Sequence, residues 1–133
     1  MPLPDTFPAC LVMRGGELTP GPGAAPRPRP GALRRCASDE ELRAAPGDAC
    51  RLCREAGALV IRARIGGQAH RLAVTGGEAV YRGPRVRAYW KADGWTLTSA
   101  EPAAELAEGE RIDLSPCAAL IAEAMRAEDG GPV

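Results

Sequence analysis

Hydrophobic and polar residues alternate with a period of two along residues 58–100, the pattern of β-strands that bury one face and expose the other. The alternation predicts strands at about 58–65, 68–75, 78–82, 85–92 and 95–100. The dipeptides between them are Gly-Gly, Gly-Gly, Gly-Pro and Asp-Gly, and such dipeptides are typical of tight turns between antiparallel strands. This part of the chain is therefore expected to form a five-stranded antiparallel β-meander.

Two-residue turns would also fix the pairing of these strands and the face that each side chain takes. The expected pairs are Ile61 with Leu72, Leu72 with Tyr81, Tyr81 with Val86, and Trp90 with Leu97. One face then collects Leu59, Ile61, Ile65, Leu72, Val74, Tyr81, Val86, Trp90, Trp95 and Leu97. The other face collects Arg62, Arg64, Arg71, Arg82, Arg85, Arg87 and Lys91, with Val60, Val80 and Tyr89 among them. The first face is the expected core, and the second is a cationic surface.

Helical patterns flank the predicted meander. Ser38 and Glu41 have the spacing of a capping box, which predicts a short helix that ends before Pro46. Residues 48–57 (DACRLCREAG) are interpreted as a second short helix, because an aspartate begins the stretch and a glycine ends it. Apolar residues recur at helical spacing in 115–131, which predicts a longer helix that covers the apolar face of the sheet. The stripe consists of Cys117, Leu120, Ile121, Ala124 and Met125.

Residues 14–31 are rich in Pro and Gly and have no apolar period, so they are expected to form a flexible or polyproline-like arm outside the core. The stretch Pro-Arg-Pro-Arg-Pro within it is also compatible with a ligand for an aromatic groove, although a spacer is the simpler interpretation. The expected organisation is an arm at 1–33, a single α+β domain at 34–129 and a tail at 130–133. The domain would consist of a short helix, the meander and a C-terminal helix.

Charge is unevenly distributed along the chain, although 17 basic and 17 acidic residues cancel. Residues 58–100 hold seven basic and two acidic residues, whereas 101–133 hold two basic and eight acidic ones. Overall neutrality argues against a general polyanion binder. No stretch resembles a signal peptide, and no apolar run approaches the roughly 20 residues of a membrane span. The protein is thus expected to be soluble and cytoplasmic, with its five cysteines as free thiols.

Several short motifs follow one another in a recognisable order. They are LVIR at 59–62, which the sequence REAG at 54–57 leads into, HRLAV at 70–74, VRAY at 86–89, GWTLT at 94–98 and SPCAALI at 115–121. In this order, and together with a preceding short helix, they resemble the Src homology 2 domain, a family that binds phosphotyrosine peptides. The resemblance covers about residues 46–128.

The resemblance implies a non-enzymatic module that binds a phosphotyrosine-like peptide and needs no cofactor. In that family the arginine at the position of Arg62 grips the phosphate. The remaining residues of the implied phosphate site are Arg64, Arg71, Arg87, Lys91 and Tyr89. Either Arg87 or Lys91 would complete the pocket, and Tyr89 would pack on the phosphotyrosine ring. Arginine suits this role because its planar, permanently charged group offers two parallel donors to an oxyanion.

The cationic face has two other interpretations. Antiparallel sheets commonly leave one face in water, so the arginines are also explained as the solvated face of a small interaction or structural protein. RNA binding is the second interpretation, because arginines and Tyr89 suit phosphates and bases. Overall neutrality, a single exposed aromatic residue and the lack of an RNA-binding motif weaken it.

The remaining candidates are metal ligands and catalytic residues. Cys50 and Cys53, together with Cys36 and His70, supply four residues that can bind zinc, but a lone CxxC in a helix-like stretch is more typical of core cysteines. His70 falls on the apolar face and is expected to be a packed core histidine. The sequence offers no Ser/His/Asp set, no P-loop and no pair of carboxylates at a strand end, so an enzyme is not expected.

Overall fold

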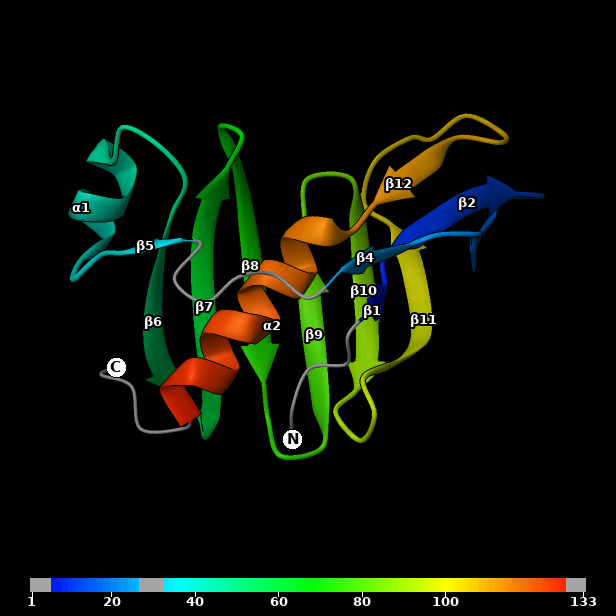
Figure 1. Ribbon diagram of the computed structural model, residues 1–133. Coiled ribbons are helices and arrows are strands. Elements are labelled where there is room, and N and C mark those ends of the chain that lie inside the picture. Colours follow the sequence, from blue (N-terminus) through cyan, green and yellow to red (C-terminus); the bar gives the residue numbers. More distant parts are fainter. Residues whose placement is uncertain (1–5, 27–32, 129–133) are drawn as a thin grey trace.

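A seven-stranded sheet separates two helices in the computed structural model, which describes residues 6–26 and 33–128 (Figure 1). The elements are β1 (Thr6–Pro8), β2 (Cys10–Arg14), β3 (Glu17–Pro20), β4 (Ala24–Pro26), β5 (Arg34–Arg35), α1 (Asp39–Ala44), β6 (Ala49–Glu55), β7 (Ala58–Ile65), β8 (Gln68–Val74), β9 (Glu78–Arg82), β10 (Val86–Lys91), β11 (Thr96–Pro102), β12 (Arg111–Asp113) and α2 (Ser115–Glu128). The α+β class is thus confirmed, whereas the sheet has more strands than the five expected.

The five predicted strands are present as β7 to β11, and they pair in chain order. The large sheet runs β11-β10-β9-β8-β7-β6-β5, and all of its pairs are antiparallel except β5 with β6. Three expected pairs are confirmed: Ile61 with Leu72, Leu72 with Tyr81, and Trp90 with Leu97. The alternation and the turn dipeptides therefore identified the central meander correctly.

One expected pair is wrong, because the turn between β9 and β10 is longer than two residues. Tyr81 lies opposite Ala88 rather than Val86. Arg82 pairs with Arg87, and the N–H of Gly83 donates to the carbonyl of Val86 at 2.9 Å, which closes a four-residue connection. A shift of two residues leaves the paired side chains of β9 and β10 on their expected faces, because the period of a strand is two.

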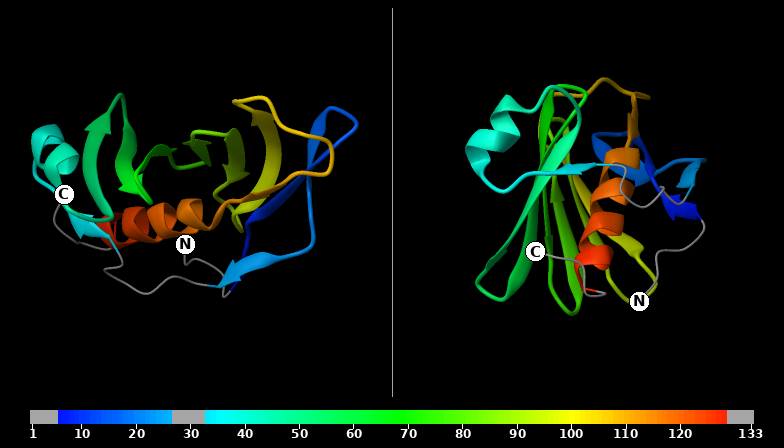
Figure 2. Two further views of the ribbon diagram at one scale, coloured as in Figure 1. Left: turned by 90° about the horizontal axis from the view of Figure 1, so that it is seen from above. Right: turned by 60° about the vertical axis from the view of Figure 1, so that its left-hand side comes forward.

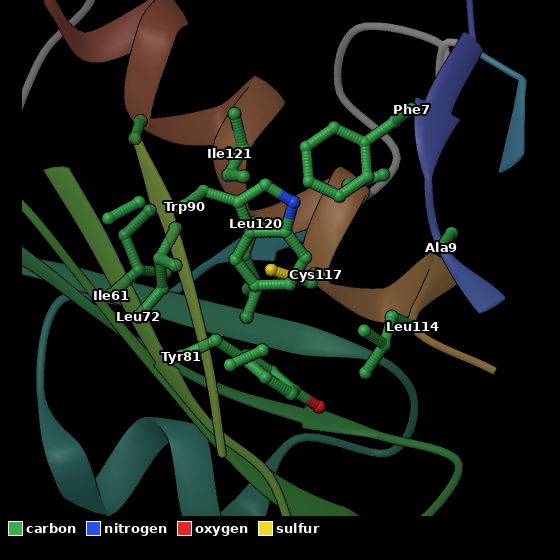
Figure 3. Packing of buried hydrophobic residues seen from close by; sticks show 14 of the residues in the cluster. Phe7, Ala9, Ile61, Leu72, Tyr81, Trp90, Leu114, Cys117, Leu120 and Ile121 are labelled. Carbon is green, nitrogen blue, oxygen red and sulfur yellow. The ribbon is translucent and has the colours of Figure 1, made fainter. Parts of the chain in front are cut away.

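The core lies between the sheet and α2, as the helical stripe predicted. Leu120 and Ile121 of α2 are fully buried against the inner face of the sheet, which contributes Ile61 and Leu72 (Figure 3). The ring of Trp90 completes this layer in the same view. Burying an aliphatic side chain of this size stabilises a fold by about 1.5–3 kcal/mol, so this interface is a major source of stability.

The N-terminal segment is not the flexible arm that the sequence suggested. Strands β2 and β3 form a hairpin whose turn, Gly15–Gly16, has φ values of 60° and 82°, which glycine adopts without strain. Phe7 and Leu11 are fully buried in the main core. The prediction for 1–33 is therefore wrong over the described part, residues 6–26 and Leu33. Most of the Pro-Arg-Pro-Arg-Pro stretch and the predicted tail at 130–133 lie outside the described residues.

Residues 48–57 form a strand and a turn rather than the expected short helix. Strand β6 pairs antiparallel with β7 from Ala49 opposite Arg64 to Glu55 opposite Ala58. The two turn residues, Ala56 and Gly57, both have positive φ values, 49° and 83°. The sequence REAG is thus the end of a strand and its hairpin turn. The helix that the Src homology 2 resemblance places directly before the arginine strand is therefore absent from this position.

The short helix α1 is confirmed, and it lies on the opposite face of the sheet from α2 (Figure 2). The side chain of Ser38 accepts from the backbone N–H of Glu41 at 3.1 Å, as in a capping box. Leu42 packs in a small second core with Cys36, Ala45 and Ala49. Because Ala49 shares its face of β6 with Arg51 and Cys53, α1 covers one corner of the cationic face.

Candidate functional site

Five arginines lie directly opposite one another on five neighbouring strands. Arg51 of β6 pairs with Arg62 of β7, which pairs with Arg71 of β8. Arg71 in turn lies opposite Arg82 of β9, and Arg82 lies opposite Arg87 of β10. We call these five residues the arginine row. Neighbouring strands are about 4.8 Å apart, so the row spans about 19 Å across the outer face.

Two carboxylates offset part of the charge of the three arginines at the end of the row next to α1. Asp39, in the first turn of α1, pairs with Arg51 at 3.1 Å and with Arg62 at 3.6 Å. Glu55 pairs with Arg62 at 3.0 Å and with Arg71 at 3.6 Å. All of these side chains are partly exposed, and such ion pairs typically stabilise a fold by no more than about 1 kcal/mol each.

The other end of the row carries positive charge without a bound counter-charge. Arg82 and Arg87 are exposed, and neither side chain makes an ion pair or a hydrogen bond with any residue that the structure describes. Glu101 lies opposite Arg87 on β11, yet the two side chains form no ion pair. This end is therefore the part of the face that is open to an external anion.

A second row of mainly apolar residues runs beside the first. On each of the five strands, the residue two positions away from the arginine on the same face belongs to this second row. We call it the apolar row, and it consists of Cys53, Val60, Ala73, Val80 and Tyr89. Val60 is only 1% exposed although it faces outward. The reason is that Arg62 and Arg71 extend along the strands past Val60 to reach Glu55, so their aliphatic stems cover it. Ala73, Val80 and Tyr89 remain half-buried.

The structure places the predicted phosphate-site residues on the outer face but does not gather them around one point. Arg62 and Arg71 are neighbours that share Glu55, whereas Arg87 lies two strands beyond Arg71. Tyr89 belongs to the apolar row, and Lys91 lies opposite Glu78. Arg62, Arg71 and Arg87 therefore lie in a line across the strands and do not surround a single phosphate.

Arg64 has a different role from the one implied for it. Its guanidinium group donates to the carbonyl of Leu42 at 3.2 Å and to the carbonyl of Arg43. Both carbonyls belong to the last turn of α1, where a positive charge is favoured by the helix dipole. Arg85, another predicted member of the cationic face, lies in the β9–β10 connection and pairs with Glu110. Neither side chain belongs to the arginine row.

Two members of the row were not predicted as site residues. Arg51 was missed because 48–57 was interpreted as a helix. If Ala56 and Gly57 are taken as a two-residue turn, the pairing rule used for the other hairpins places Arg51 directly opposite Arg62. Arg82 was assigned to the correct face but was left out of the implied site, because the Src homology 2 resemblance gives that position no role.

The cysteines and His70 do not converge on a metal. Since β6 is a strand, Cys50 faces the main core and Cys53 faces outward. The described residues contain no group of three or more side chains arranged to hold a metal ion. Burial, together with the nearby charge of Glu123, raises the pKa of the Cys50 thiol to about 12. Such a thiol stays protonated at neutral pH and is a poor metal ligand.

His70 is the packed core histidine that its position predicted. Its Nδ1 lies 2.6 Å from the hydroxyl oxygen of Tyr81, and both rings are buried. Burial lowers the pKa of His70 below its ordinary value of 6.5 and raises that of Tyr81. The pair lies beside a cavity of about 310 Å³ at the end of the sheet, whose wall also includes Arg85 and Asp113.

Comparison of the chain with models of protein families, with curated proteins and with solved structures found no match. Neither described helix combines the length and the apolar character that crossing a bilayer requires.

Proposed function

We propose that this protein is a non-enzymatic binding module that engages an anionic peptide through the arginine row. The observation that supports the proposal is the register of the sheet, which puts five arginines directly opposite one another. Like charges in such positions destabilise a sheet, and only Asp39 and Glu55 offset them in the described structure. A sheet selected for stability alone would mix the two signs of charge.

An anionic partner would remove this repulsion and gain directed hydrogen bonds. Each guanidinium group offers several N–H donors in a fixed plane, which suits carboxylates and phosphates. Hydrogen bonds to charged groups contribute about 1.5–3 kcal/mol each. Phosphotyrosine, the ligand implied by the sequence resemblance, is one such anion, and acidic side chains are another. The exposed pair of Arg82 and Arg87 is the expected first point of contact.

A peptide suits this face better than RNA. The protein has no net charge, and carboxylates border the row at both ends, at Asp39 and at Glu101. Such carboxylates repel a long phosphate backbone. Four of the five aromatic side chains are buried in the main core, which leaves Tyr89 alone to stack on a base.

Fluorescence anisotropy at low salt tests the proposal with three labelled probes: a phosphotyrosine peptide, an oligoglutamate peptide and an RNA homopolymer. At least one of the two peptides should bind. Arg82→Ala and Arg87→Ala should each weaken that binding by roughly tenfold or more, the loss of one charge-assisted hydrogen bond. The matched control is Arg14→Ala, since Arg14 is also an exposed arginine on a strand, in the smaller sheet with β12. Its effect should stay within about twofold.

Three outcomes would overturn the proposal. If neither peptide binds, or if Arg14→Ala reduces binding as much as Arg82→Ala does, the face is merely solvated. If the RNA binds more tightly than both peptides, and its affinity falls steeply with salt, the partner is a nucleic acid. Circular dichroism of each variant confirms that the changes act on binding rather than folding.

A further inference from the structure

The arginine row and the apolar row lie side by side on the outer face, and together they restrict the shape of the partner. We infer that the partner segment is an amphipathic α-helix that lies across the strands, with an acidic stripe on the arginine row and an apolar stripe on the apolar row. The inference rests on the proposed function and specifies the class of anionic peptide. A helix is favoured by the distances between the arginines, by the apolar row beside them, and by the presence of both unpaired and paired arginines in the row.

Spacing favours a helix over an extended peptide. The arginine row offers five charges over about 19 Å, from β6 to β10. Acidic residues at positions i, i+3, i+7, i+10 and i+14 share one side of a helix and span about 21 Å. In an extended peptide every second side chain points the same way, so five of them span about 27 Å. The helix therefore stays in step with the row, and the extended chain does not.

The distance between the apolar row and the arginine row also suits a helix. It runs parallel to the arginine row, about 7 Å away along the strands, the distance between side chains two residues apart. Two neighbouring stripes on a helix about 10 Å wide are separated by a similar distance. Val80 and Tyr89 are half-buried beside the unpaired Arg82 and Arg87, so acidic and apolar contacts are available together at this end.

The other end of the row is occupied by the protein's own carboxylates. Glu55 holds Arg62 and Arg71 over Val60, so an incoming helix must compete with it for both guanidinium groups. Once released, the two arginines can turn to the partner and expose Val60 to its apolar stripe. Replacing Glu55 with glutamine should therefore strengthen binding, which is the opposite of the effect of removing an arginine.

Two peptides of identical composition and about 18 residues, long enough to form a helix across the row, provide the test. In the first, glutamates take the five positions named above and leucines take the neighbouring stripe. In the second, the same residues are permuted so that the glutamates are spread around the helix. Anisotropy measures affinity, and circular dichroism measures the helix content gained on binding.

The first peptide should bind at least roughly tenfold more tightly than the permuted one, and it should gain helix content when it binds. Arg82→Ala and Val80→Asp should weaken its binding, Glu55→Gln should strengthen it about threefold or more, and Arg14→Ala should leave it unchanged. The variants need only retain the circular dichroism spectrum of the wild type to be informative.

Failure of this inference is distinguishable from failure of the proposed function. If both peptides bind equally, or if a short phosphotyrosine peptide without helix content binds more tightly than either, the partner is not a helix, although the arginine row still binds anions. If no anionic peptide binds at all, the proposed function fails as well. Tighter binding of the RNA homopolymer would assign the face to nucleic acid.

Discussion

At the scale of single residues, the buried pair of His70 and Tyr81 links stability to pH. The imidazole and the hydroxyl group lie 2.6 Å apart in the core, and burial lowers the pKa of His70 below 6.5. The unfolded chain therefore takes up a proton at a higher pH than the folded protein does. Between these two pKa values the unfolded state binds more protons, so the free energy of unfolding rises with pH.

We expect the free energy of unfolding to be nearly constant between about pH 7 and pH 8, and to fall as the pH drops through 6.5 toward the lowered pKa of the folded state. Urea unfolding at several pH values measures it. His70→Gln removes the titrating group, so the fall in this range should be smaller in the variant. Parallel curves for both proteins would show that His70 does not control the pH dependence.

A buried carboxylate gives a second prediction at this scale. Glu123 of α2 is 1% exposed and pairs with Arg35 of β5 at 3.1 Å and with Arg126 at 3.2 Å. Arg35→Met would leave the buried carboxylate with one of its two counter-charges and would remove a donor to the carbonyl of Glu123, so it should cost about 3 kcal/mol in chemical denaturation, the low end of the cost of breaking a buried ion pair. The neighbouring Arg34 is a matched control, because its side chain is 59% exposed and lies 3.8 Å from Glu41.

Arg34→Met should change the free energy of unfolding by less than about 1 kcal/mol. Replacing Arg35 and Glu123 together with methionine should cost less than Arg35→Met alone, because the buried carboxylate that has lost a counter-charge is then removed as well. An equal loss for Arg34→Met and Arg35→Met would contradict a specific role for the buried pair.

At the scale of elements, the arginine row should lower the stability of the free protein. Arg82 has an arginine directly opposite on both neighbouring strands, and like charges in these positions are destabilising. Arg82→Thr keeps a residue that suits strands and should raise the free energy of unfolding by about 0.5–1 kcal/mol. Thermal denaturation at low salt measures the effect.

High salt should shrink this gain, because salt screens the repulsion. Arg14→Thr, on the hairpin of β2 and β3, should give no comparable gain. If Arg82→Thr destabilises the protein at low salt, the arginines of the row do not repel one another, and their charge needs no partner to offset it. A variant that is more stable and binds less tightly would instead show that the face is shaped by binding.

The elements that the sequence predicted correctly are those with an unambiguous period. Alternation over 58–100 and the turn dipeptides specified β7 to β11 and assigned the arginines to one face. The interpretation of 48–57 failed because cysteines three residues apart fit a helix, and because Ala56 takes a positive φ that alanine rarely adopts. Arg51 belongs to the row only because β6 is a strand, so the helical interpretation of 48–57 could not include it.

At the scale of the whole molecule, the N-terminal segment completes the core. Its many prolines and glycines suggested an arm without regular structure. Yet Arg14-Gly15-Gly16-Glu17 has the same Gly-Gly turn as two of the hairpins that the sequence predicted correctly, and it forms a hairpin too. The segment's fully buried residues Phe7 and Leu11 belong to the main core, to which distant strands and α2 also contribute. Phe7, for example, stacks on Trp90 of β10 with ring centroids 5.1 Å apart. Local pattern alone does not reveal such a long-range contact.

A chain that begins at residue 34, the domain boundary that the sequence suggested, would lack Phe7 and Leu11, both fully buried, and would expose Trp90 to water. Losing a buried phenylalanine side chain alone costs about 3–5 kcal/mol, a large part of the stability of a domain of this size. We therefore expect the shortened chain to show no cooperative unfolding transition in tryptophan fluorescence. In the full chain, Phe7→Ala should unfold at a lower urea concentration than Phe7→Leu.

A shortened chain that unfolds at the same urea concentration as the full protein would contradict this expectation. It would mean that strands β1 to β4 pack on a core that is already complete without them, and that the N-terminal segment adds no stability, as expected of an arm.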